Sequence, residues 1–261
     1  MSQSDQFNGR LGLIFASIGA AIGTGNIWRF PRMVGANGGG TFLIPWLIFL
    51  FAWSIPLVIA EYAMGKRSRT GTIGTFRIFA GRRFAWMGLW TAWISTAIGF
   101  YYAVVSGWTL KYFQLGITGA LSGEKVDTTE VWNAFLQSPG QVIFFQFVVI
   151  LLVLGTIWKG AKAIEKVNFY LMISLFALLF LTLFLSLWMD LSDGSLDGAL
   201  FMFTVDFDML LEPEVWINGL SQSAWSCSAG MGMCITYAVY MSKDEDTVLN
   251  GFTMGLANNS I

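Results

Sequence analysis

The chain has 261 residues, of which 55% are apolar, 16% aromatic and only 12% charged. A soluble domain carries about 25% charged residues, so the composition argues against a soluble protein, and the high hydrophobicity argues against disorder. The net charge is −1, without the basic excess that would suggest a nucleic-acid partner. There is no histidine, which removes the most usual general base and the commonest metal ligand. Long apolar runs between charged loops therefore predict a polytopic membrane protein.

Six apolar stretches are long enough to cross a bilayer, because a hydrocarbon core about 30 Å thick needs roughly 17–25 residues per helix. They cover residues 11–35, 41–62, 86–113, 141–158, 167–188 and 215–240. A seventh begins near Val248 and runs to Ile261. We therefore expect an all-α integral membrane protein whose residues 1–261 form a single transmembrane domain.

The basic residues predict the orientation of these spans, since cytoplasmic loops are enriched in Lys and Arg. The loop after the second span holds six basic residues and no acidic one, and the loop after the fourth adds three lysines. The loop at 189–214, on the opposite side, holds seven acidic residues and no basic one. We expect a cytoplasmic amino terminus and a multi-pass protein of the inner (plasma) membrane.

The first span carries a signal for an interrupted helix. Three glycines and a polar amide fall within residues 19–26, and each glycine costs about 1 kcal/mol in a helix interior relative to alanine. Unwound backbone at bilayer depth survives only when it is buried in protein or lines a wet cavity. The alternative is close helix packing, because Gly19 and Gly23 form a small-xxx-small pair.

The sixth span repeats this pattern at residues 222–232, a segment that is again small, polar and glycine-containing. Two Gly-interrupted spans, five helices apart, are typical of the binding site of an inverted-repeat transporter. Unwound carbonyls can coordinate a cation, and exposed N–H groups at helix amino termini favour a carboxylate. We interpret both interruptions as parts of one site that could hold a zwitterion beside Na⁺.

Several ordered strings resemble the neurotransmitter:sodium symporter family, in its bacterial type. They are RLG at 10–12, NIWRFP at 26–31, NGGGTFLIP at 37–45, EYAMGK at 61–66, TYAVY at 236–240 and KDED at 243–246. The resemblance runs through the whole chain, yet the chain covers only about half of the family. It implies a LeuT-like inverted-repeat fold with discontinuous first and sixth helices, in which helices one to five and six to ten form the two repeats.

The resemblance also implies a division of the chain. Residues 1–188 would form the first five-helix repeat, 189–214 an extracellular loop, and 215–261 helix six and the start of helix seven. The chain is then truncated in helix seven. Either the sequence is a truncated one, or the protein is half-length and needs a complement.

Two sodium sites follow from the resemblance. The first would use the carbonyl of Ala21 and the side chains of Asn26, Ser226 and Asn258. The second would use the carbonyls of Gly19 and Ile22, with its remaining partners in helix eight. All of these ligands are oxygens, which hard cations prefer.

The resemblance implies a substrate site and two gates as well. The substrate-binding residues would be Ala21, Thr24, Gly25, Tyr102, Trp225, Ser226, Ser228 and Met231. The N–H groups of Thr24 and Gly25 and the hydroxyl of Tyr102 would meet the carboxylate, and Trp225 and Met231 would touch the substrate side chain. Arg29 and Gln222 would belong to the extracellular gate, and Tyr240 to the cytoplasmic gate.

Plainer alternatives exist for three of the polar or aromatic residues. Tyr102 could be a packing aromatic of the third helix, and Arg29 could be an arginine that snorkels to the interface. Glu61 is an acid within an apolar span, a position that is by default functional or paired within the bundle. We favour a partner for broken backbone over a proton relay at Glu61.

These observations predict sodium-coupled symport of a neutral, apolar or aromatic amino acid by alternating access. The alternative is a half-length subunit or fragment that functions only when assembled with a complementary chain, either a second copy or a missing carboxy-terminal half. An intramembrane enzyme fits poorly, because Glu61 would be its only clearly intramembrane acid. We expect no enzymatic cofactor, Na⁺ as a co-transported ligand, and no nucleic-acid partner.

Overall fold

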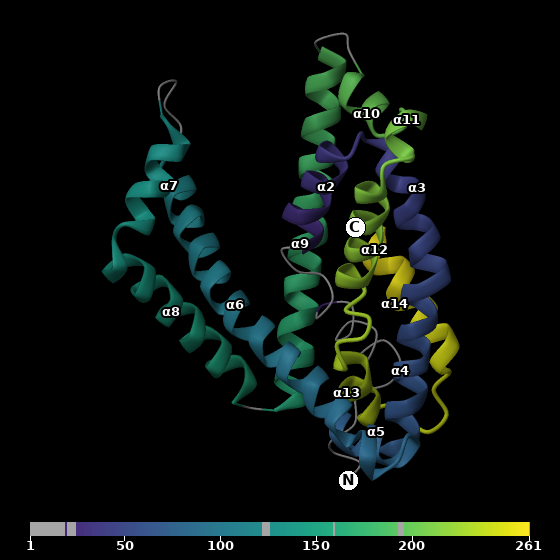
Figure 1. Ribbon diagram of the computed structural model, residues 1–261. Helices are drawn as coiled ribbons and strands as arrows, with labels where there is room; N and C mark the ends of the chain where they lie inside the picture. The colour runs from purple at the N-terminus through teal and green to yellow at the C-terminus, as the bar shows by residue number, and fades with distance from the viewer. Residues whose placement is uncertain (1–18, 20–24, 122–125, 159, 193–195, 261) are drawn as a thin grey trace. The chain divides into compact units, whose positions relative to one another are not determined.

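The computed structural model describes residue 19 and residues 25–121, 126–158, 160–192 and 196–260, which form helices, turns and short connections (Figure 1). No strand occurs within these ranges. The chain divides into two compact units, one of Met1–Ala92 with Glu165–Ile261 and the other of Trp93–Ile164. Each unit is described by itself below.

The predicted second span is longer than the sequence indicated and is bent by a wide turn. Helix α3 (Gly40–Phe49) continues through the π-helix η3 (Leu50–Ser54) into α4 (Ile55–Ser68). Pro56 is the second residue after η3, and a proline removes the backbone N–H that would bond to the carbonyl four residues earlier. The π-turn is therefore placed where the helical hydrogen-bond ladder is already interrupted.

The predicted interruption of the sixth span is confirmed. Six residues separate the end of helix α12 (Pro213–Ser226) from the start of α13 (Met233–Val239). Between them, Ser228, Gly230 and Gly232 have φ of 51°, 81° and 74°, a left-handed conformation that ends a helix and that glycine adopts without strain.

The carboxy-terminal part of the first span is also irregular. A π-helix, η2 (Gly25–Arg29), leads into α2 (Phe30–Ala36). Residues 20–24, the centre of the predicted interruption, lie outside the described residues, so that interruption stays a prediction.

The remaining elements connect or extend these helices. In chain order they are α5 (Thr72–Phe79), the 3₁₀ helix η4 (Arg82–Phe84), α6 (Ala85–Ile117), α7 (Thr128–Leu136), α8 (Pro139–Ile157), α9 (Ala161–Ser192), α10 (Asp197–Phe201), α11 (Phe207–Leu210) and α14 (Thr247–Asn259). The predicted acidic loop at 189–214 thus contains the two short helices α10 and α11.

Four helical stretches of the described chain are long and apolar enough to cross a membrane. They are Gly40–Ser68, Arg82–Ile117, Pro139–Ile157 and Lys166–Ser192, which correspond to the predicted second to fifth spans. The sixth is absent from this set because its interruption leaves two short helices. Almost none of the apolar windows of α8 and α9 is buried, and their large apolar side chains are mostly exposed, which suits contact with a bilayer better than contact with water.

The core of the first unit lies where α12 packs on α3 and where α13 and α14 pack on α4 (Figure 1). Small residues allow these close approaches. A Cβ added at Gly65 would stand 2.2 Å from the carbonyl oxygen of Ile235, and one at Gly219 would stand 2.9 Å from the backbone nitrogen of Trp46. Phe42, Val58 and Tyr62 fill the space between the helices.

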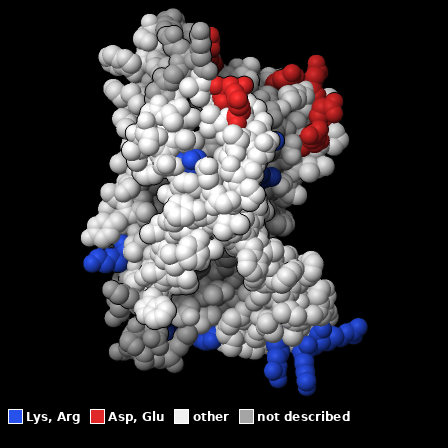
Figure 2. Space-filling view, turned by 90° about the vertical axis from the view of Figure 1, so that its left-hand side faces the viewer, with Lys and Arg blue, Asp and Glu red and all other residues white. Residues whose placement is uncertain are grey.

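In Figure 2, acidic side chains gather near the upper end and most basic ones lie in the lower part. In the first unit, one group of acidic residues lies on α10, α11 and the start of α12, and a second group, Asp244, Glu245 and Asp246, directly precedes α14. The bases lie at the end of α4, on α5 and on η4. This separation agrees with the predicted orientation, which stays a prediction.

The second unit is held by aromatic contacts. The ring of Trp132 on α7 lies edge-on to Trp108 of α6 at 5.1 Å between centroids and is tilted against Tyr112 at 5.9 Å. Phe135 contacts Phe145 of α8 at 6.3 Å. Helix α7 begins at Asp127, whose carboxylate accepts hydrogen bonds from the backbone N–H groups of Thr129 and Glu130.

Candidate functional site

Polar side chains from three separate segments of the first unit meet at one point. Asn26 of η2 donates its amide to the backbone oxygen of Asn258 at 2.6 Å and to the side-chain oxygen of Asn258 at 3.2 Å. Asn258 of α14 donates in turn to the backbone oxygen of Ser226 at 2.7 Å and to its hydroxyl at 3.0 Å. Three of the four residues predicted for the first sodium site are therefore in one hydrogen-bonded chain, and Ala21 lies outside the described residues.

Asn26, Ser226 and Asn258 are called the asparagine cluster below. This cluster contains one hydrogen-bond acceptor that no described residue uses. The side-chain oxygen of Asn26 is buried and accepts no hydrogen bond from any described residue. A buried polar atom without a partner costs about 1–3 kcal/mol, and a bound cation is one way to satisfy it. The described residues bring no three Asp, Glu, Cys or His side chains together as metal ligands. The cluster instead offers neutral oxygens, which suit a singly charged hard cation better than a transition metal.

The end of α12 forms a complete Schellman motif beside the asparagine cluster. The N–H of Ala229 donates to the carbonyl of Ala224 at 3.0 Å, and the N–H of Ser228 donates to that of Trp225 at 3.1 Å. Serine rather than glycine takes the left-handed position, at φ 51°. Trp225 and Ser226 are predicted substrate-binding residues, and the resemblance implies that their carbonyls meet the substrate ammonium. Each of these carbonyls accepts one hydrogen bond already, and a carbonyl oxygen has a second lone pair available.

Glu61 of α4 contacts the end of the same interruption that leads into α13. Its carboxylate accepts a hydrogen bond from the backbone N–H of Gly232 at 3.2 Å, directly before α13 begins. The side chain is only 5% exposed. This geometry agrees with the interpretation of Glu61 as a partner for broken backbone.

Arg29 joins the first helix to α12. One guanidinium nitrogen donates to the side-chain oxygen of Gln222 at 2.8 Å and the other to the hydroxyl of Ser221 at 3.0 Å. The guanidinium carbon also lies 5.8 Å from the ring centroid of Trp225. The residues predicted for the extracellular gate thus contact each other over Trp225, while their gating role stays a prediction.

The other predicted residues are spread more widely. Gly25 begins η2, Met231 lies between α12 and α13, and Tyr240 is the residue directly after α13. Gly19 lies against α9, where an added Cβ would stand 3.4 Å from the side chain of Asn168. Ile22 and Thr24 lie outside the described residues.

Tyr102 belongs to the second unit, where its ring lies edge-on to Tyr101 at 5.8 Å. Both the predicted contact with a substrate carboxylate and the packing alternative stay open for it.

Sequence reasoning missed Asn259, which forms a hydrogen bond with Ser226 of the asparagine cluster. The hydroxyl of Ser226 donates to the side-chain oxygen of Asn259, and the amide of Asn259 donates to the carbonyl of Gly255 at 2.7 Å and to the sulfur of Cys227 at 3.2 Å. Two consecutive asparagines in an apolar stretch were the available signal. A buried hydroxyl pair, Ser54 with Ser223 at 2.6 Å, was also missed.

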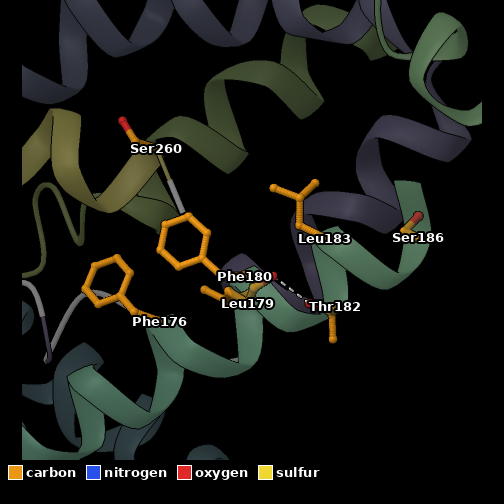
Figure 3. A pocket seen from close by; sticks show the side chains of 7 residues that line it. All are labelled: Phe176, Leu179, Phe180, Thr182, Leu183, Ser186 and Ser260. Atoms are coloured by element: carbon orange, nitrogen blue, oxygen red, sulfur yellow. Dashed lines mark hydrogen bonds between the residues drawn. The ribbon is translucent and has the colours of Figure 1, made fainter. Parts of the chain in front are cut away.

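A separate hollow of about 450 Å³ lies on α9 beside the end of α14 (Figure 3). It is lined by Phe176, Leu179, Phe180, Thr182, Leu183, Ser186 and Ser260. The hydroxyl of Thr182 donates to the carbonyl of Leu179 at 2.9 Å and that of Ser260 to Leu256 at 2.7 Å, so both serve their own helices. The hollow contains no predicted site residue and no charged group that would hold a zwitterion.

Comparison with known proteins settles the class of this helical arrangement. Residues 4–137 and 136–261 match the sodium:neurotransmitter symporter family. The chain belongs to this family. The family consists of transporters that use Na⁺ as a co-transported ion, and it contains no enzymes.

Relatives in the sodium:neurotransmitter symporter family span archaea and mammals. The chain is 33% identical to the sodium-dependent transporter MJ1319 of Methanocaldococcus jannaschii, over 98% of this chain and 53% of the relative. It is 31% identical to the sodium-dependent neutral amino acid transporter SLC6A17 of Rattus norvegicus, over 96% of this chain and 39% of the relative. The chain thus spans about half the length, or less, of the curated relatives it matches.

A solved structure confirms the fold. The crystal structure of MhsT in complex with L-phenylalanine superposes with a TM-score of 0.86 at 32% identity, over 98% of this chain and 58% of that chain. The LeuT-like fold predicted from the sequence strings is therefore correct, and the chain is a multi-pass membrane protein.

Proposed function

We propose that this chain serves sodium-coupled transport of a neutral amino acid by alternating access. The asparagine cluster carries the proposal, because it joins η2, α14 and the end of α12 through one set of neutral oxygens with an unused buried acceptor. A sodium ion bound there would hold together the very segments that line the interrupted sixth helix.

The coupling follows from thermodynamic linkage. If Na⁺ and the amino acid both require the arrangement around Ser226, each raises the affinity of the other by the same factor. An inward sodium gradient then drives uptake against the amino-acid gradient. Ala21, Asn26, Ser226 and Asn258 would hold the first ion, while Gly19 and Ile22 would contribute to a second.

The substrate is a neutral amino acid, with an apolar or aromatic side chain. Among the predicted site and gate residues, only Arg29 carries a charge at neutral pH, and it already donates hydrogen bonds to Gln222 and Ser221. Trp225 and Met231 offer apolar walls beside the interruption. The MhsT structure holds L-phenylalanine, and SLC6A17 is named as a neutral amino acid transporter, which supports this choice.

A second candidate function uses the same site, but a single copy of the chain does not complete it. In it, the chain is a half-length subunit or fragment that binds only when a complementary chain, or a second copy, supplies the later helices. The half-length match to the relatives favours this candidate. In both cases we propose residence in the inner membrane with the amino terminus in the cytoplasm.

The test is equilibrium binding of a mixture of radiolabelled neutral amino acids to the purified 261-residue chain, in Na⁺ and in K⁺ at equal ionic strength. We expect saturable binding in Na⁺ only, and we expect Asn258→Ala to abolish it. A chain that is folded by its helical circular dichroism and binds in neither salt would contradict the first candidate. Binding restored by adding a complementary half would then establish the second.

A further inference from the structure

Helix α5 packs with the reverse of the polarity usual for a soluble helix. Its threonines face inward: Thr75 is fully buried and its hydroxyl contacts that of Ser68 at 2.6 Å, while Thr72 lies against Gly232 and Gly88. Its large apolar side chains face outward, with Ile78 57% and Phe79 45% exposed. An exposed apolar face on a well-anchored short helix indicates a surface that is covered by something other than water.

Exposed arginines surround this apolar face. Arg77 is on α5, and Arg82 and Arg83 form the start of η4. Within the described part of the chain, none of these three side chains has a hydrogen bond or an ion pair, and the guanidinium of Arg83 lies 6.0 Å from the ring of Phe84. The sequence contains no Asp or Glu from residue 62 to residue 123, so no acidic neighbour along the chain neutralises them.

The location of α5 fits a membrane boundary. It lies between two helical stretches long enough to span a bilayer, Gly40–Ser68 and Arg82–Ile117. Basic side chains gather in the lower part of Figure 2, and α5 lies at the lower end of Figure 1. Segments that directly flank spans lie at the depth of the lipid headgroups, where arginine and aromatic side chains are both favoured.

We propose that Arg77, Ile78, Phe79, Arg82, Arg83 and Phe84, together called the α5 patch, bind the headgroup of an anionic phospholipid. The guanidinium groups match the phosphate oxygens with paired N–H donors, and Ile78, Phe79 and Phe84 lie against the first acyl carbons. A general excess of positive charge on one side of the membrane would not require apolar side chains between the arginines. The α5 patch is therefore a local site.

The test is native mass spectrometry of the purified chain, with equal amounts of phosphatidylglycerol and phosphatidylcholine added to the detergent. We expect the wild-type chain to retain phosphatidylglycerol preferentially. Each basic residue near an anionic membrane surface contributes roughly fivefold in affinity, so R77Q/R82Q/R83Q should lose on the order of 100-fold of that preference.

The matched control is K159Q/K162Q/K166Q, which removes the same charge from the other basic loop and should keep the preference. Equal loss in both triple variants, or no loss in either, would overturn the proposal. Inorganic phosphate should not displace the retained lipid, and displacement at millimolar phosphate would overturn the assignment to a phospholipid. If R77Q/R82Q/R83Q fails to fold, the wild-type chain is crosslinked to a photoactivatable phosphatidylglycerol instead, and the crosslinked residues are identified by mass spectrometry. Crosslinks within residues 72–86 support the α5 patch, and crosslinks confined elsewhere refute it.

Discussion

Asn26 is the residue on which the proposed sodium site most depends. Its amide nitrogen makes both contacts with Asn258, and its oxygen is the buried acceptor without a described partner. We expect Asn26→Ala to weaken Na⁺ and amino-acid binding together, each by at least tenfold, which corresponds to about 1.4 kcal/mol. Equilibrium binding of a radiolabelled amino acid, measured by scintillation counting at varied Na⁺ and varied substrate concentrations, gives both affinities.

The control for this substitution is Asn133→Ala, which removes an exposed asparagine on α7 and should leave both affinities unchanged. Loss of sodium affinity with an unaltered substrate affinity at saturating Na⁺, or the converse, would count against a site shared by the two ligands.

Glu61 is the residue that separates a structural role from a proton relay. Glu61→Gln keeps a side-chain oxygen that can accept from Gly232, so we expect stability and sodium-dependent binding within about twofold of wild type. Glu61→Ala leaves that N–H without a partner and should lower the free energy of unfolding by about 1–3 kcal/mol. Thermal unfolding in detergent and the binding assay measure the two effects. A well-folded Gln variant that no longer accumulates substrate in vesicles would point to the proton relay instead.

At the scale of the element, the close contact between α4 and the half-helix α13 depends on a glycine, Gly65, which has no side chain. Gly65 lies so close to Ile235 that a Cβ would meet its carbonyl oxygen at 2.2 Å. Backbone cannot move aside as a flexible side chain can. We therefore expect Gly65→Ala to destabilise the protein by about 1–3 kcal/mol, visible as a lower Tm.

The same substitution at Gly35 provides the comparison. Nothing lies within 4 Å of a Cβ there, and Gly35 is in α2, where alanine is intrinsically better than glycine by up to about 1 kcal/mol. Gly35→Ala should be neutral or stabilising. A Gly65→Ala variant with an unchanged Tm would show that α13 does not pack on α4 as described.

The far end of α13 is held by basic side chains from the end of α4. One guanidinium nitrogen of Arg69 donates to the backbone oxygens of Val239 and Met241, and the ammonium of Lys66 donates to the backbone oxygen of Glu245 at 2.5 Å. Cations stabilise helix carboxyl termini, where carbonyls lack intrahelical partners.

We therefore expect Arg69→Ala to accelerate amide hydrogen exchange in residues 239–246 by about tenfold, since hydrogen bonds from charged groups are each worth about 1.5–3 kcal/mol. Exchange followed by mass spectrometry measures this. Arg67→Ala removes an exposed arginine two residues earlier and should leave the exchange in this segment unchanged. Equal acceleration in both variants would attribute the effect to lost charge rather than to the contacts of Arg69.

At the scale of the whole molecule, the open question is whether one copy of this chain suffices. The first proposal predicts a sharp monomer by native mass spectrometry that retains sodium-dependent amino-acid binding. A mass of two or more chains, with binding confined to that species, would instead favour the complementary-chain candidate. The measurement is decisive because the chain matches only about half of each relative.

Sequence patterns predicted much of the fold. The apolar stretches located the second to fifth spans within a few residues at most ends, and the polar, glycine-containing segment at 222–232 located the interruption between α12 and α13. These features are local, because the length of an apolar stretch and a loss of helix preference both depend only on residues that are adjacent in the sequence. The carboxyl ends of α4, α6 and α9 were placed too early, because a helix continues into polar residues as long as its backbone bonds are satisfied.

The candidate site was predicted in part. The family resemblance named Asn26, Ser226 and Asn258, and the structure brings these three together. It did not indicate Asn259, the Ser54–Ser223 pair or the Schellman motif with serine at its left-handed position. Each of these depends on which face of a helix meets which neighbour, and spacing along the chain does not specify that pairing.

The sequence by itself determined that this is a helical membrane protein with an interrupted sixth helix, because bilayer thickness and unsatisfied backbone constrain consecutive residues directly. Its ordered strings separately indicated the sodium:neurotransmitter symporter family. Only the tertiary structure decided that Asn26 contacts Asn258, that Arg29 contacts Gln222 and that Glu61 supports Gly232. These partners are 171 to 232 residues apart. Such pairs form only when helix packing brings buried polar groups close enough to satisfy one another, since lipid offers them no other partner.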